Sequence, residues 1–153
     1  ADLITEILSG GGSSRLFQAL VKEKQLFSNI DCYHLGSTDA GLLTISGKLI
    51  KGVKMEDAEA AVNEELIKLQ QDGISQRELD KVINKTESMI AFEDMSVTNR
   101  AASLAMYELM GDADLINKEL DRYRAVTADE IKKECKIIFD EKNTNTLYYY
   151  SNN

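Results

Sequence analysis

The sequence predicts an α+β domain, in which a small, mostly antiparallel sheet is covered on one face by helices. Two observations predict this class. Residues 27–50 contain two segments of period-two alternation joined by turn residues, and the helical periodicities that follow run without a proline or a low-complexity tract. Residues 144–151 are rich in β-forming side chains and predict a closing strand.

The first 24 residues predict two helices separated by a triple glycine. Residues 1–9 show helical spacing of apolar side chains, and glycines 10–12 end this helix. Ser13 and Ser14 are N-cap candidates for a second helix, which reaches about Lys24. Its apolar stripe comprises Leu16, Phe17, Leu20 and Val21. A triple glycine before a helix could cradle phosphate, but a Walker lysine–serine pair is absent, so we interpret it as a hinge between packed helices.

A hairpin follows. Residues 27–35 alternate, with Ile30, Cys32 and His34 on one face. Residues 36–41 have the composition of a turn, and residues 42–50 form the second strand. The face of this second strand that we expect to point inward carries Leu43, Ile45, Gly47 and Leu49.

The rest of the chain predicts helices with readable ends. Helices are expected over 55–72, from 76 to a break or restart near 96, over 100–110, from 112 to about 124, and from 128 to near 139. Gly73 is the stop signal of the first of these. Ser75 with Glu78, and Thr127 with Glu130, have the spacing of capping boxes.

Size and charge limit the classes of function. The 153 residues fit one domain, 1–153, which we expect to be a fragment of a longer chain. A net charge of −8 leaves no basic stripe for phosphates, so nucleic acid is excluded as a principal partner. No apolar run approaches the roughly 20 residues of a membrane helix. Cys32 and Cys135 are predicted to be buried free thiols.

No catalytic site can be assembled from this chain. A zinc hydrolase usually supplies three protein ligands, and the chain contains one histidine. His34 shares a strand face with Cys32 and has no evident third ligand, so we expect no metal here. Methionines within 89–110 could form an adaptable binding surface, but core filling is the favoured interpretation. The carboxylates predicted to face solvent are Glu56, Asp57, Glu59, Glu64, Glu65, Glu78 and Asp80.

A group of motifs carries a resemblance to a known family. They are the glycines 10–12, the run Ser13-Ser14-Arg15-Leu16-Phe17, residues 20–26, and Asp39-Ala40-Gly41-Leu42-Leu43. These residues resemble the C-terminal half-domain of the M16 zinc metallopeptidases, the pitrilysin, insulinase and mitochondrial-processing-peptidase family. The later order of helices, including 114–124 and the helix start at 125–131, with a final strand, extends the resemblance over the whole chain.

The resemblance implies a LuxS/MPP-like metallohydrolase half-domain that pairs with an N-terminal half of its own chain. In this family the N-terminal half carries the zinc and an inverted HxxEH motif, and homo- or heterodimers of subunits enclose a chamber for extended peptides. The resemblance therefore implies zinc in the full-length protein only, with ligands outside this chain. The balance of apolar and charged residues predicts a soluble protein, and we expect it in the bacterial cytoplasm or periplasm.

One family feature is replaced here. Many members carry an arginine and, seven positions later, a tyrosine that contact bound peptide, and these positions are occupied by Val21 and Ser28. The leading hypothesis is that the chain is the C-terminal half of a zinc metalloendopeptidase, inactive by itself, which forms a chamber wall and supports the zinc-bearing half. The alternative is a non-catalytic assembly or peptide-binding subunit, of the processing-peptidase alpha or respiratory core-protein type.

Overall fold

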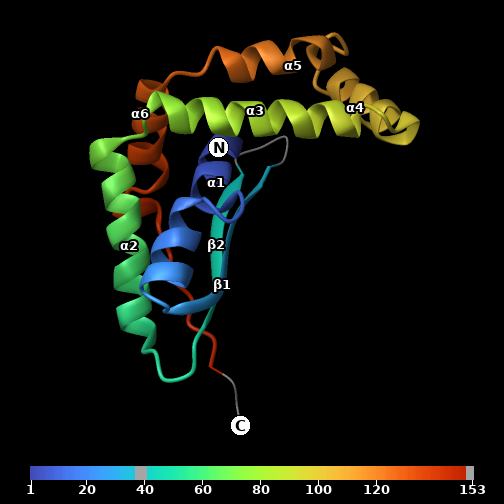
Figure 1. Cartoon of the computed structure of the whole chain (residues 1–153). Helices are drawn as coiled ribbons and strands as arrows, with labels where there is room; N and C mark the ends of the chain where they lie inside the picture. The colour runs from blue at the N-terminus through green and yellow to red at the C-terminus, as the bar shows by residue number, and fades with distance from the viewer. Residues whose placement is uncertain (37–40, 151–153) are drawn as a thin grey trace.

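The computed structural model describes residues 1–36 and 41–150, and within them helices cover one face of a two-stranded antiparallel sheet (Figure 1). The predicted fold class is confirmed. The elements are α1 (Asp2–Ser9), the π-helix η1 (Phe17–Glu23), β1 (Phe27–Leu35), β2 (Leu42–Leu49), α2 (Met55–Asp72), α3 (Gln76–Glu93), α4 (Val97–Leu109), α5 (Leu115–Arg124), α6 (Ala128–Ile138) and the 3-10 turn η2 (Glu141–Asn143).

The hairpin has the predicted strands and faces. Cys32 lies opposite Ile45 and Leu35 opposite Leu42, with one irregularity between Phe27 and Asn29. Residues 37–40 of the predicted turn, which include Asp39 and Ala40 of the family motif, lie outside the described residues.

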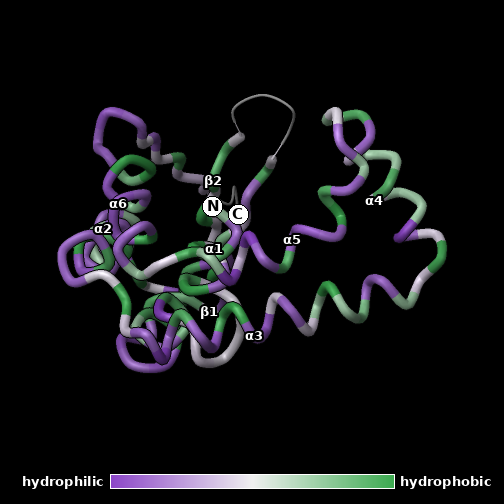
Figure 2. Tube along the Cα trace, turned by 90° about the horizontal axis from the view of Figure 1, so that it is seen from above, coloured by the Kyte–Doolittle hydropathy of each residue, from purple (hydrophilic) through white to green (hydrophobic). Residues whose placement is uncertain are grey.

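The core lies between the sheet and the helices. Helix α1 packs against β1, and α2 and α6 pack against each other on the side of α1 that faces away from the sheet (Figure 1). Apolar segments gather at this junction when the chain is viewed from above (Figure 2). The side chains that are nearly completely buried include Ile4, Ile7, Leu8, Leu16, Leu20, Leu69, Leu79, Val82 and Cys135. Helix α1 is therefore the central element of the core, because apolar side chains on it are buried from several sides.

Helix α2 has the predicted bounds, but one of its side chains does not face solvent as expected. Ala58, Ala61, Leu66 and Leu69 are buried as predicted. Glu65 is also buried, and its carboxylate lies 2.7 Å from Lys68 Nζ. A buried carboxylate with a lysine one turn away keeps its charge paired, which explains how this position tolerates glutamate.

The helix caps follow the sequence closely. Thr127 and Glu130 form the predicted capping box at the start of α6. The predicted restart near residue 96 is confirmed, since α3 ends at Glu93 and the Ser96 side chain caps α4. Gly73 ends α2 with a φ of 73°, a conformation that favours glycine.

The prediction that the methionines of residues 89–110 fill the core is wrong. Met95 and Met106 have 78% and 55% of their surface exposed, and Met89 and Met110 are also exposed. They lie between the last turns of α3 and the residue that follows α4, in a part of the chain that extends away from α2 and α6 (Figures 1 and 2). Helical spacing alone identifies an apolar face, and it does not say whether another element covers that face.

The predicted closing strand is absent from the described residues. Residues 144–150 form no strand, and Ser151 lies outside the described residues. The side chains of Thr146 and Tyr148 instead donate to the carboxylate of Glu59 on α2, with 2.5 Å for each oxygen pair. Within residues 1–36 and 41–150 no strand pairs with this segment, and these two side-chain hydrogen bonds join it to α2.

None of the helices formed by residues 1–36 and 41–150 is long and apolar enough to cross a membrane.

Candidate functional site: the glycine turn and the hairpin

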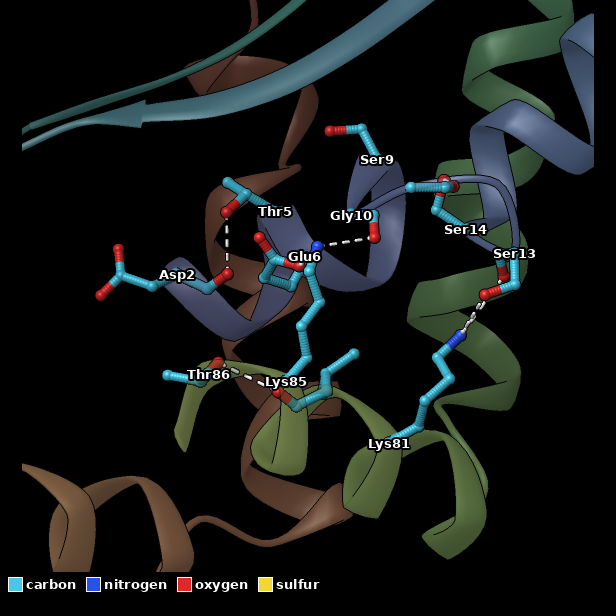
Figure 3. Close-up of polar contacts among 12 residues, drawn as sticks. Asp2, Thr5, Glu6, Ser9, Gly10, Ser13, Ser14, Lys81, Lys85 and Thr86 are labelled. Atoms are coloured by element: carbon cyan, nitrogen blue, oxygen red, sulfur yellow. Dashed lines mark hydrogen bonds and ion pairs between the residues drawn. The ribbon is translucent and has the colours of Figure 1, made fainter. Parts of the chain in front are cut away.

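The triple glycine makes a tight turn whose backbone is fastened at several points (Figure 3). Gly11 has a φ of +113°, which only glycine adopts readily. Ser14 donates both its N–H, at 3.0 Å, and its hydroxyl, at 2.6 Å, to the carbonyl of Gly11. The helix begins at Arg15, so Ser14 occupies the predicted N-cap position and Ser13 does not. The Ser14 carbonyl accepts from the Gln18 N–H at 3.0 Å, but its hydroxyl is bonded to Gly11 and does not cap the helix.

Two lysines of α3 bind the carbonyl oxygens of this turn (Figure 3). Lys85 Nζ lies 2.7 Å from the Gly10 oxygen and also pairs with Glu6. Lys81 Nζ lies 3.3 Å from the Ser13 oxygen and 3.2 Å from its hydroxyl. A phosphate site would instead present backbone N–H groups to the ligand. The turn is therefore a joint that fastens α1 to α3, which agrees with the hinge interpretation.

A matched pair of glycine substitutions tests this joint. A Cβ at Gly10 would overlap the backbone of Glu6, whereas a Cβ at Gly12 meets nothing within 4 Å. We expect Gly10→Ala to lower the free energy of unfolding by about 2 kcal/mol and Gly12→Ala to change it by less than about 0.5 kcal/mol. Urea denaturation measures both, and equal effects at the two glycines would contradict the tight turn.

The helix after the turn differs from the expected α-helix. Residues 17–23 form a π-helix in which Leu20 is completely buried. Lys22 Nζ lies over the ring of Phe17, 5.5 Å from the ring centroid. The apolar stripe was predicted from helical spacing, and spacing over seven residues does not separate an α-helix from a π-helix.

The two positions where the family's peptide-contacting residues are replaced have structural contacts in this chain. Val21 packs against the hydrophobic core. Ser28 lies on β1, and its hydroxyl donates to the carbonyl of Lys48 on β2 at 3.0 Å, next to the strand irregularity. These contacts are structural and give no evidence that either side chain binds peptide.

The only histidine is paired with a carboxylate. His34 Nδ1 lies 3.2 Å from Asp2 Oδ1, and Asp2 also accepts a hydrogen bond from Tyr123 at 3.2 Å. Cys32 is buried on the same strand face, and burial raises the pKa of its thiol from 9.0 to about 12. Among residues 1–36 and 41–150 no three histidine, cysteine or acidic side chains gather as metal ligands, so in these ranges His34 and Cys32 have no third side chain that would complete a set of zinc ligands.

Both thiols are expected to be unreactive in the folded protein. Burial raises the pKa of Cys135 to about 11, as it raises that of Cys32 to about 12. At pH 8 we expect Ellman's reagent to label neither thiol before unfolding and both after it. Both thiols have a higher pKa in the folded state than the ordinary value of 9.0, so folding favours the protonated thiol. The stability that the two protonated thiols contribute is therefore present below pH 9 and is lost as the pH rises toward 11 to 12. Rapid labelling of Cys32 at pH 8 without unfolding would contradict its burial.

Sequence reasoning missed the strongest polar contact near the turn. Arg15 donates from Nε and Nη2 to the two carboxylate oxygens of Glu78, at 2.9 and 2.8 Å, and from Nη2 to the Gly73 carbonyl at 2.8 Å. Ser75 caps α3 as predicted, but Glu78 binds Arg15 and does not complete the predicted capping box. Arg15 is part of the family motif, but the sequence does not indicate its partner, because Glu78 lies 63 positions away.

Comparisons with known proteins agree with this architecture. Residues 1–86 match the family described as the peptidase M16 inactive domain. A curated relative is the uncharacterized zinc protease YmxG of Bacillus subtilis (strain 168), which is 24% identical over 140 residues. The match covers 91% of this chain and 34% of YmxG, so the chain spans about a third of the length of that relative.

Solved structures share the fold. A protease from Helicobacter pylori superposes with a TM-score of 0.83 at 22% identity, covering 93% of this chain and 34% of that one. A candidate zinc protease from Bordetella pertussis Tohama I gives 0.81 at 25% identity, covering 93% and 78%. The inactive peptidase domain of a candidate zinc protease from Bordetella parapertussis gives 0.83 at 24% identity, covering 93% and 77%.

Proposed function

The chain belongs to the family of peptidase M16 inactive domains, and from this premise we propose that it is the C-terminal, non-zinc-binding half of a zinc metalloprotease. In this proposal it pairs with an N-terminal half of the same protein that holds the zinc. It forms one wall of a chamber for peptides, and the complete protein is a homo- or heterodimer of such subunits.

The observation that carries this proposal is the family match across the glycine turn and the hairpin, at residues 1–86. Two further observations support it. The curated relative is described as a zinc protease and is about three times as long as this chain. Among residues 1–36 and 41–150 no three histidine, cysteine or acidic side chains gather as metal ligands, so a zinc ion would need ligands from elsewhere in the protein.

The surface that suits the chamber is the face of the hairpin opposite to the helices. On β1 this face carries Asn29, Asp31 and Tyr33, which are exposed. A sheet face with polar, solvated side chains offers few apolar contacts, so it suits a chamber wall that does not bind peptides tightly. The helix-covered face serves as the rigid support.

The alternative function is a non-catalytic subunit that assembles with other M16 chains. The presence of Val21 and Ser28 where many members have arginine and tyrosine favours it, because valine packs into the core and offers no polar contact to peptide. In a two-half protease the opposite half can supply this pair, so the replacement does not exclude the protease function.

Peptidase assays on the full-length protein separate the two functions. We expect it to cleave an unstructured, quenched-fluorescent peptide, to lose that activity with a zinc chelator, and to regain it when zinc is returned. Residues 1–153 alone are expected to be inactive under the same conditions. A full-length protein that neither binds zinc nor cleaves peptide would contradict the protease function and favour the assembly function.

A further inference from the structure

Residues 89–110, which we call the arm, carry an apolar surface that the described residues leave open. The arm comprises the end of α3, the turn after it, α4 and the residue that follows α4. Eight of its large apolar side chains are exposed, and those of Phe92, Val97 and Leu109 have 75%, 83% and 74% of their surface exposed. Side chains exposed to this degree offer on the order of 100 Å² each, so the arm presents roughly 800 Å² of apolar surface, more than the largest patch of a typical monomer.

Helix α4 is apolar on more than one side. None of its residues is buried, although Val97, Leu104, Met106, Leu109 and three alanines lie on it. At about 3.6 residues per turn, Val97 and Met106 lie on opposite sides of the helix. Helix α5 packs against α4 and leaves both of these side chains exposed. A helix that is apolar around most of its circumference is typical of a position covered from several sides. We therefore expect a further element to cover α4.

The size of this surface favours a permanent partner. About 800 Å² is the contribution of one partner to an interface of standard size. A peptide that binds and leaves would open the surface in every cycle, and an open apolar patch of this size promotes aggregation. A segment that belongs to the same polypeptide keeps the patch covered at all times.

The charges of the arm disfavour a second copy of this chain as the partner. Glu93, Asp94 and Glu108 are acidic and Arg100 is basic, so residues 89–110 have one positive charge against three negative ones, a net charge of −2. A two-fold contact would place this acidic surface opposite itself, and like charges across an interface raise its energy. A different surface, with basic groups around an apolar centre, fits the arm better.

The start of the chain lies beside the helices that carry the arm. Asp2 accepts a hydrogen bond from Tyr123 of α5 at 3.2 Å, and α1 packs against α3 (Figure 1). At the other end of the described chain, Tyr148 binds Glu59 near the start of α2, away from the arm (Figure 1). The match covers 34% of YmxG, so about two-thirds of that relative lies outside it. In a longer protein, the polypeptide N-terminal to Ala1 therefore starts near the arm.

We propose that the arm is the surface on which the N-terminal half of the same polypeptide docks, through an apolar patch surrounded by basic side chains. The inference deepens the proposed function, because it rests on the part in which residues 1–153 pair with such a half, and it assigns the contact to residues 89–110. The docked half covers the sides of α4 that α5 leaves open. The contact itself requires neither zinc nor peptidase activity.

Methionine oxidation in the full-length protein tests whether the arm is covered. Hydrogen peroxide converts an accessible methionine to its sulfoxide, which mass spectrometry detects at each site. With the arm covered, Met95 and Met106 are expected to oxidise at least about tenfold more slowly in the folded protein than in urea. Slowing of less than about tenfold at Met95 would overturn the proposal, since its side chain is 78% exposed in residues 1–153 alone.

A matched control uses a methionine on a different helix. Ile137 lies on α6 and is 61% exposed, close to the 55% of Met106. In the variant Ile137→Met, the new methionine is expected to oxidise within about threefold of its rate in urea, because the proposed contact is confined to the arm. Equal slowing at this position and at Met106 would overturn the assignment of the contact to residues 89–110.

The same oxidation measurement separates the possible occupants. The slowing should persist on hundredfold dilution and should need no added peptide. Loss of the slowing on dilution would indicate a second copy, and dependence on an added unstructured peptide would indicate a substrate; either result would overturn the proposal.

Photocrosslinking identifies the docked segment. Phe92 is replaced by p-benzoylphenylalanine, which keeps an aromatic ring at this exposed position, in a mixture of chains with natural and heavy nitrogen. We expect cross-links to residues N-terminal to Ala1 within chains of a single isotope. Cross-links that join light and heavy chains, or that reach residues 1–153 only, would overturn the proposal.

The failure of this inference can be told apart from the failure of the proposed function. Slow oxidation of the arm in a protein that binds no zinc and cleaves no peptide would contradict the protease function alone. Zinc-dependent cleavage by a protein whose arm oxidises as rapidly as in urea would overturn the docking of the arm alone.

Discussion

Replacing Arg15 by methionine is expected to lower the free energy of unfolding by about 2 kcal/mol, because it leaves the Glu78 carboxylate and the Gly73 carbonyl without their shared donor. A fully buried pair broken on one side costs about 3–5 kcal/mol. The smaller value applies here because the Arg15 and Glu78 side chains retain 24% and 21% of their exposure. Urea denaturation followed by circular dichroism measures the change.

Two further variants separate geometry from charge. Arg15→Lys keeps the charge but cannot donate to both carboxylate oxygens and to Gly73, so we expect it to recover less than half of the loss. Arg124→Met breaks the contact with Glu87, where the arginine is 56% exposed, and should cost less than about 1 kcal/mol. Equal losses for Arg15→Met and Arg124→Met would show that the Arg15–Glu78 contact contributes no more to stability than an exposed ion pair.

Leu69→Ala is expected to have the largest effect of the substitutions considered, about 3 kcal/mol of lost unfolding free energy. Leu69 has no exposed surface and lies on α2, which packs against α6. Its truncation leaves a cavity that the surrounding helices fill only in part. Ile67, two residues away on the same helix, is 48% exposed, and Ile67→Ala should cost less than about 1 kcal/mol. Similar losses at both positions in urea denaturation would contradict the inferred orientation of α2.

The elements that the sequence predicts well are those determined by local patterns. The bounds of α2 follow from amphipathic spacing and from Gly73, and the start of α6 follows from the Thr127–Glu130 capping box. The buried face of β1 follows from period-two alternation. Each of these signals acts within a few residues, so a single sequence contains the whole of it.

The errors arise where a distant segment decides the structure. Glu78 has the spacing of a capping box, but it binds Arg15 because that guanidinium lies within reach in the folded chain. Residues 144–150 have strong β propensity, but they form no strand in the absence of a neighbouring strand. The methionines of residues 89–110 were expected to fill the core, but the described residues do not cover them. Propensity and periodicity describe what a segment can do, and partners decide the outcome.

The candidate site illustrates the same limit. The glycine turn and the hairpin could be located from the sequence, and the family resemblance rests on them. The role of the turn in joining α1 to α3 could not be predicted from the sequence, because it depends on Lys81 and Lys85, which lie about 70 residues further along the chain. The proposed protease activity is a property of a longer protein, so this chain contributes the support and not the chemistry.

Zinc content of the full-length protein, with and without His34→Ala, tests this division most directly. The account predicts one zinc per chain and an undiminished zinc content in the variant, because among residues 1–36 and 41–150 no further side chains gather with His34 as metal ligands. Loss of zinc in the variant would place this domain in the metal site, and a full-length protein that binds no zinc would remove the protease function; either result contradicts the account.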